Sequence, residues 1–133
     1  MSGAQEVSLS EPRKFRAALV QMRTSRNVIA NIDAAARMIR EAKSLGADYA
    51  QTPEQTSLME LDRASLFGHI VEEERDPALA AFQELARELN IQLHVGSLAV
   101  KIAPEKAANR AFRNSACRKL STKMPTMSYL TAG

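Results

Sequence analysis

Hydrophobic and polar positions along the chain predict strands that alternate with helices. An almost continuous apolar run in the second half of residues 14–22 is typical of a strand covered on both faces. Residues 24–27 supply helix-capping types, and apolar residues then recur at helical spacing over residues 28–42. Gly46 is a suitable helix end, because glycine takes the left-handed conformation without steric cost. The predicted apolar stripe consists of Val28, Ile29, Ile32, Ala35, Ala36, Ile39 and Ala42.

A second strand is predicted directly after Gly46, in the short apolar stretch that precedes Pro53 and Glu54. Strand, helix and strand in this order form a βαβ unit, whose two strands are parallel.

The middle of the chain predicts a second helical crossover. Residues 62–70 are weakly helical, and the charge run at residues 72–75 is typical of a solvated turn. Asp76 and Pro77 are favoured types at the start of a helix, and Asn90 is a suitable end.

The last patterned part of the chain predicts two more strands. Over residues 91–100, apolar and other side chains alternate as in a strand, while residues 104–108 predict a loop and residues 109–112 the start of a fourth strand. Residues 113–133 have no sustained period and no acidic residue. We therefore expect a polar leader at residues 1–13, an α/β domain at residues 14–112 and an irregular tail at residues 113–133.

The composition fits one ordinary globular domain. The chain has 133 residues, of which 45% are hydrophobic and 25% charged, so a core can form without metals or disulfides. No apolar run is long enough to cross a bilayer, and the polar N-terminus lacks the apolar centre of a signal peptide. Cys117 is the single cysteine, so no internal disulfide can form. We expect a cytoplasmic protein with no membrane partner.

The net charge of +3 lies in the tail. Arg113, Arg118, Lys119 and Lys123 are its basic residues, which leaves a net charge of −1 for residues 1–112. A nucleic-acid binder would depend on these four side chains, and Tyr129 is the one aromatic residue of the tail. The sequence therefore predicts no nucleic-acid partner.

Several kinds of site are disfavoured by spacing. The five glycines never fall close enough together to form a phosphate-binding loop. His69, His94 and Cys117 match none of the usual metal-ligand spacings. Ser97 follows Gly96 but lacks the second glycine of a nucleophile elbow. We expect neither a metal nor a cofactor.

Glu54 is the strongest candidate for chemistry. It follows Pro53 at the far end of the predicted second strand, and ligands of open α/β sheets collect beyond the carboxyl ends of strands. A carboxylate there is expected to be partly desolvated, which makes it a stronger base. From position alone, a solvated or capping glutamate after a turn-forming proline is an equally good interpretation.

Three motifs occur in order within residues 14–112. The first is Ala-Ala-Leu-Val-Gln-Met at residues 17–22, followed by Asn31. The second spans residues 41–54, from Glu-Ala through Gly-Ala-Asp to Pro-Glu, and the third spans residues 85–112, from Leu-Ala through Gly-Ser to Asn-Arg-Ala-Phe. Together they resemble the N-terminal part of the carbon–nitrogen hydrolase, or nitrilase, family, especially its omega-amidase-like and short-chain amidase members.

The resemblance implies the N-terminal part of a four-layer αββα sandwich, which in the complete family domain assembles into homo-oligomers. It also implies hydrolysis of a small amide or nitrile through a Glu, Lys, Cys triad, without metal or cofactor. In that chemistry the glutamate takes the thiol proton, the thiolate attacks the carbonyl and the lysine stabilises the charge on oxygen. By motif position, Glu54 is the base. Lys123 lacks the family's Asp-Lys context and Cys117 its Cys-Tyr-Asp setting, so neither is assigned.

We therefore expect a carbon–nitrogen hydrolase sequence that leaves the family pattern after Phe112, with a frameshift as the hypothesis for the change. Such a fragment is expected to be inactive and to expose one edge and one face of an unfinished sheet, which favours aggregation. The alternative is a small non-catalytic α/β interaction module that does not use Glu54, and cooperative unfolding of a monomer would favour it.

Overall fold

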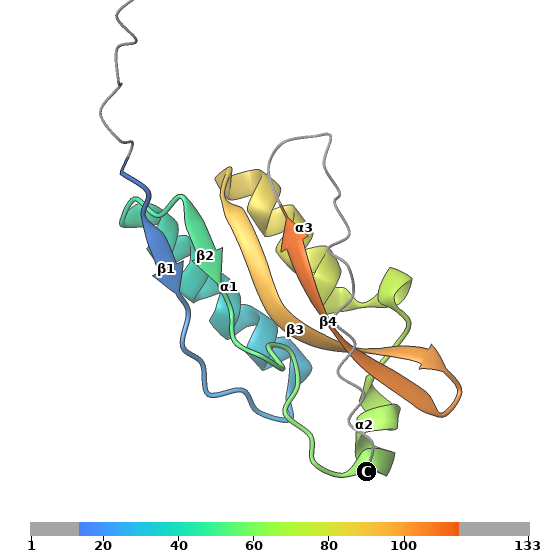
Figure 1. The fold of residues 1–133 in the computed structure, drawn as a ribbon. Coiled ribbons are helices and arrows are strands. Elements are labelled where there is room, and N and C mark those ends of the chain that lie inside the picture. Colours follow the sequence, from blue (N-terminus) through green and yellow to red (C-terminus); the bar gives the residue numbers. More distant parts are fainter. Residues whose placement is uncertain (1–13, 115–133) are drawn as a thin grey trace, which may run out of the picture.

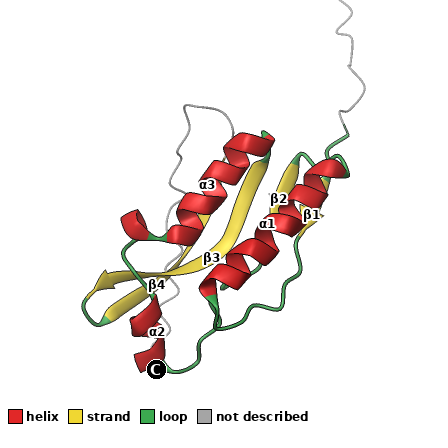
Figure 2. Ribbon diagram, turned by 180° about the vertical axis from the view of Figure 1, so that it is seen from behind, coloured by secondary structure: helices red, strands yellow, loops and turns green. Residues whose placement is uncertain are grey.

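The computed structural model describes residues 14–114, which form a four-stranded mixed sheet with two long helices on one face. The strands lie in the order β1-β2-β3-β4, with β1, β2 and β3 parallel and β4 antiparallel to β3 (Figure 1). Figure 2 shows α1 and α3 side by side across the same face of the sheet. The elements are β1 (Ala17–Leu19), α1 (Val28–Ser44), β2 (Tyr49–Gln51), α2 (Arg63–His69), the 3-10 helix η1 (Glu73–Arg75), α3 (Pro77–Leu89), β3 (Gln92–Ala103) and β4 (Lys106–Asn114). The predicted α/β fold with parallel βαβ units is confirmed.

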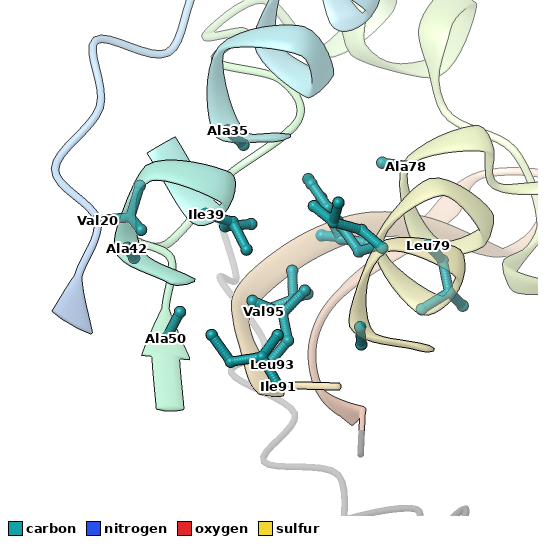
Figure 3. Packing of buried hydrophobic residues seen from close by; sticks show 14 of the residues in the cluster. Val20, Ala35, Ile39, Ala42, Ala50, Ala78, Leu79, Ile91, Leu93 and Val95 are labelled. Carbon is teal, nitrogen blue, oxygen red and sulfur yellow. The ribbon is translucent and has the colours of Figure 1, made fainter. Parts of the chain in front are cut away.

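The core lies between the two helices and the face of the sheet that they cover (Figure 3). Ile39 of α1, Phe82 of α3 and Val95 of β3 are all fully buried there. Ala35, Ala42 and Ala50 are small, so α1 can pack close to β2. No described helix is long and apolar enough to span a membrane.

Helix α1 begins and ends where the sequence predicts. The Asn27 side chain accepts a hydrogen bond from the Ala30 backbone N–H at 3.0 Å, and Gly46 has a φ of +89° just beyond the helix. The predicted apolar stripe is wrong at Ile29, whose exposed fraction is 73%. Residues two positions apart in a helix point in directions about 200° apart, so Ile29 points away from the buried side on which Asn31 lies.

The first strand differs from its prediction in length and in burial. It covers only Ala17–Leu19, and Leu19 is 79% exposed. The expected cover on both faces is therefore wrong within residues 14–114, because α1 and α3 cover only one face of the sheet (Figure 2). Within the same residues the other face is open, as expected for half of an αββα sandwich.

Strand β3 is longer than predicted and changes the phase of its alternation. The register with β4 shifts between Val95 and Leu98, as at a β-bulge. Leu93 and Val95 are buried before the shift, and Leu98 and Val100 are buried after it. The simple alternation expected for residues 91–100 is therefore wrong from Leu98 onward, because the shift moves the inward positions by one residue.

The connections around α2 and β4 match the sequence in part. The weak helix predicted at residues 62–70 is α2, and the predicted charged turn is η1. Glu73 of that turn is not fully solvated, because its carboxylate lies 2.6 Å from the Arg110 guanidinium and its side chain is only 22% exposed. Strand β4 begins at Lys106, earlier than predicted, and continues past Phe112 to Asn114.

Helix α3 begins as predicted, and its cap gives a pH-dependent prediction. Asp76 accepts hydrogen bonds from the backbone N–H groups of Ala78 and Leu79, at 2.8 and 3.0 Å. Burial raises the pKa of Asp76 above its ordinary value, although the two N–H donors act in the opposite direction. Its ionisation therefore costs more in the folded state than in the unfolded state, and folding stability from this group falls as pH rises through the raised pKa.

We expect Asp76→Asn to keep the cap and to lose the ionisation cost. The stability difference between Asp76→Asn and the parent should shift in favour of the variant as pH rises from about 3 to 7. The matched variant Asp76→Ala loses the acceptor and should be about 1–2 kcal/mol less stable than the parent. Urea unfolding across this pH range measures the stability of both variants and of the parent. If the stability difference between Asp76→Asn and the parent moves in favour of the parent with rising pH, the burial argument is contradicted.

Candidate active site

The chain turns sharply at the carboxyl end of β2, and Glu54 lies on this turn. The Thr52 N–H donates to the His94 carbonyl at 3.0 Å, so pairing with β3 continues one residue beyond β2. Pro53 then leads the chain out of the sheet. Glu54 therefore occupies the position predicted for it, beyond the carboxyl end of a parallel strand.

Gly96 of β3 allows this turn to lie directly on the sheet. A Cβ atom at residue 96 would lie 2.5 Å from the carbonyl carbon and oxygen of Pro53 and closer still to the carbonyl oxygen of Thr52. These neighbours are backbone atoms, which cannot rotate away as a side chain can. The absence of a side chain on Gly96 is therefore required for the path of the chain into Glu54.

Four polar groups form a hydrogen-bonded series inside the turn. The Gly96 N–H donates to Thr52 Oγ1 at 3.1 Å, and Thr56 Oγ1 donates to the Pro53 carbonyl at 2.6 Å. The Thr52 and Thr56 hydroxyls lie 2.8 Å apart. Because the single hydroxyl hydrogen of Thr56 is used toward Pro53, Thr52 is the donor in this pair. Both threonines are buried, so the series fixes the turn from within.

Ser97 holds the other side of the same turn. Its hydroxyl oxygen accepts from the Gln55 N–H at 2.8 Å, and its carbonyl accepts from the Thr56 N–H at 3.0 Å. Gln55 has a φ of +51°, an unusual value for a residue with a side chain, which these two contacts stabilise. Ser97 thus supports the turn that carries Glu54, a role that the sequence did not indicate, because serine at this position gives no local signal.

Glu54 itself is exposed within the described structure. The expected partial desolvation is therefore wrong for residues 14–114. The physical reason is that the described residues supply a layer on only one face of the sheet.

The open face of the sheet next to this turn carries a polar cluster. The Tyr49 hydroxyl lies 2.9 Å from His94 Nδ1 and 3.0 Å from Gln51 Oε1. Burial raises the pKa of Tyr49, while the positive charge of Arg113 acts to lower it. His94 is thus a hydrogen-bonded partner of Tyr49 in this structure.

The other two candidates for the triad, Lys123 and Cys117, lie outside the described residues. His69 lies at the end of α2, and within residues 14–114 no group of three His, Cys, Asp or Glu side chains could hold a metal ion. Hollows of about 310 and 690 Å³ lie against α3 and α1, and neither is lined by Glu54.

Comparison with known proteins found relatives among solved structures. Neither the protein-family models nor the curated proteins gave a match. An amidase from Nesterenkonia sp. is 25% identical over 77% of this chain and 38% of its own, with a TM-score of 0.64. Nit3 of Saccharomyces cerevisiae, a member of branch 10 of the nitrilase superfamily, is 20% identical over 80% of this chain and 41% of its own, with a TM-score of 0.65.

The C. elegans NitFhit protein also matches, at 20% identity over 88% of this chain and 28% of its own, with a TM-score of 0.71. The chain has a partial nitrilase-type αββα fold. The resemblance to carbon–nitrogen hydrolases in the sequence is thus confirmed. This nitrilase-type chain spans about two fifths of the length of the amidase chain from Nesterenkonia.

Two further structures show chemistry of the Nesterenkonia amidase. One variant is in complex with acrylamide, and another shows the product of Michael addition of acrylamide at the active-site cysteine.

Proposed function

We propose that Glu54 is the general base of a carbon–nitrogen hydrolase that converts a small amide or nitrile to the corresponding acid and ammonia. The observation that carries this proposal is the place of Glu54, on a tightly held turn at the carboxyl end of β2 in a nitrilase-type fold. The acrylamide bound to the Nesterenkonia amidase supports an amide as the substrate class.

In the proposed reaction the Glu54 carboxylate takes the proton of a cysteine thiol. The thiolate attacks the amide carbonyl carbon, and a lysine stabilises the oxyanion. The carbon–nitrogen bond then breaks, the proton leaves with the amine as ammonia, and water hydrolyses the thioester. The exposure of Glu54 in residues 14–114 implies that further chain must cover it before it works in this way.

We further propose that the 133-residue chain is inactive alone and that a frameshift replaces the family sequence after Phe112. Its single cysteine, Cys117, and Lys123 lack the sequence context of the family's nucleophile and lysine. The complete domain would form a homo-oligomer in the cytoplasm. The coding DNA beyond the Phe112 codon tests this directly, since one of the other two frames should encode a strand, an Asp-Lys pair and a later Cys-Tyr-Asp-like elbow.

The role of Glu54 is tested in the protein expressed from that restored frame. With acetamide and acrylamide as substrates, Glu54→Gln should lower the rate of ammonia release at least about 100-fold, because the amide side chain cannot accept the thiol proton. Glu41→Gln, on the exposed side of α1, is the matched control and should keep the parent rate. A Glu54→Gln protein that retains activity within about threefold of the parent would refute the assignment.

A further inference from the structure

The segment that follows Glu54 is bound to the loop between β1 and α1. Asn31, near the start of α1, is 3% exposed. Its Nδ2 donates to the carbonyl oxygens of Ser25 and Ser57, at 2.8 and 2.9 Å. Its Oδ1 accepts from the N–H and the hydroxyl of Ser25, at 2.9 and 3.0 Å. All four hydrogen-bonding positions of the amide are thus used, and they join two loops that are far apart in the sequence.

Glu60 joins the same two loops by a second route. Its side chain is only 3% exposed, whereas that of its partner Arg26 is 74% exposed. One Glu60 carboxylate oxygen accepts from the Asp62 N–H at 3.1 Å, and the other lies 3.5 Å from Arg26 Nε. The Met59 N–H also donates to the Ser25 carbonyl at 3.0 Å.

The burial of Glu60 needs a physical explanation, because a buried carboxylate is costly unless it is paired. An aliphatic side chain would fill the same space without that cost. The carboxylate supplies what an aliphatic group cannot, namely an acceptor for the Asp62 N–H and an anion for Arg26. These contacts fix the end of the segment at residues 55–61.

We propose that Asn31 and Glu60 form a clasp that positions Glu54. The clasp consists of Ser25 and Arg26 on the loop before α1, Asn31 in the first turn of α1, and Ser57, Met59 and Glu60 on the segment after Glu54. Ser97 holds the turn immediately after Glu54, and the clasp holds the chain three to six residues further on. Glu54 thus lies at an exposed corner whose outgoing chain is attached both to β3 and to the loop that follows β1.

Asn31 and Glu60 are positioning residues in this proposal, and its catalytic meaning rests on the proposed role of Glu54 as a base. An exposed carboxylate samples many positions unless its backbone is fixed, and a base must lie within hydrogen-bond reach of the proton it accepts. Two anchors on the outgoing chain restrict that backbone before any further layer covers it.

Asn31→Asp tests the first half of the clasp in the 133-residue chain. The substitution keeps the shape and the acceptors but removes both donors and adds a buried charge. We expect the Met59 amide to exchange with solvent about 10- to 100-fold faster, while the amides of α3 change by less than about threefold. Asn27→Asp is the matched control, because it makes the same chemical change at an exposed helix cap of the same helix. It should leave the Met59 amide unchanged.

Two substitutions of Glu60 test the second half of the clasp: one removes its carboxylate, and the other restores an acceptor. Glu60→Ala should accelerate exchange at Met59 and shift the backbone and side-chain NMR resonances of Glu54. Glu60→Gln keeps an acceptor for the Asp62 N–H and should restore most of the protection and most of the Glu54 resonance positions. A residue needed only for general stability would not move the Glu54 resonances while the signals of α3 stay in place.

Two results would overturn the clasp. The first is an equal acceleration of amide hydrogen exchange at Met59 and in α3, in both Asn31→Asp and Glu60→Ala, since equal acceleration reports only global opening of the protein. The second is unchanged Glu54 resonances in Glu60→Ala. Neither measurement requires turnover, so the two proposals fail in different ways. If Glu54 is not the base, Glu54→Gln keeps its activity while amide exchange and the Glu54 resonances behave as predicted. If the clasp is wrong, Glu54→Gln loses activity while amide exchange or the Glu54 resonances do not behave as predicted.

Discussion

Gly96→Ala is expected to destabilise the protein by about 3 kcal/mol, because the new methyl group would overlap the backbone of Thr52 and Pro53. The overlap can be relieved only by moving the turn away from β3. That movement would also stretch the hydrogen bonds from the Gly96 N–H to Thr52 and from the Gln55 N–H to Ser97. Equilibrium urea unfolding measures the loss as a lower midpoint at an unchanged slope.

Gly68 provides the matched control for this substitution. A Cβ atom at Gly68 of α2 meets nothing within 4 Å, so Gly68→Ala adds the same methyl group without a clash. Alanine also favours a helix over glycine, and we expect a gain of up to about 1 kcal/mol. If Gly96→Ala costs less than about 1 kcal/mol, the contact between the turn and β3 is looser than described.

Phe82→Ala is expected to cost about 3–5 kcal/mol, because it empties the largest fully buried side-chain position in the core. Phe82 belongs to the cluster formed by α1, α3 and β3, and these elements cannot close the space without moving together. Since a domain of this size has a total stability of about 5–15 kcal/mol, the loss is a large fraction of the whole.

Phe15→Ala is the control for the core substitution. Phe15 is 64% exposed, and its ring centroid lies 6.0 Å from that of Tyr49, so the same truncation should cost less than about 1 kcal/mol. Chemical unfolding of the two variants side by side gives the comparison. Equal losses would show that the core described between α1, α3 and β3 does not carry the stability of the chain.

The local signals in the sequence were reliable where a structure is decided by neighbouring residues. Asn27 and Asp76 cap the two long helices through hydrogen bonds to N–H groups two or three residues away. Asn90 takes the left-handed conformation that ends α3, with a φ of +50°. These interactions lie within a few residues of chain, so their residue types alone predict them.

The sequence was less informative where a partner from a distant segment decides the outcome. The apolar residues around Leu19 predict a covered strand, yet whether a face is covered depends on which layers pack against it. The bulge between Val95 and Leu98 depends on the pairing of β3 with β4, and alternation within β3 alone gives no sign of it.

The candidate site divides in the same way. The sequence by itself determined the βαβ order, the helix ends and, through its Pro-Glu motif, the position of Glu54 beyond β2. Only the tertiary structure decided that Gly96 and Ser97 hold the turn, that Asn31 bridges two loops and that Glu54 is exposed. Caps and strand order follow from contacts within or between adjacent elements, whereas these features require atoms from segments 26 to 44 residues apart to meet.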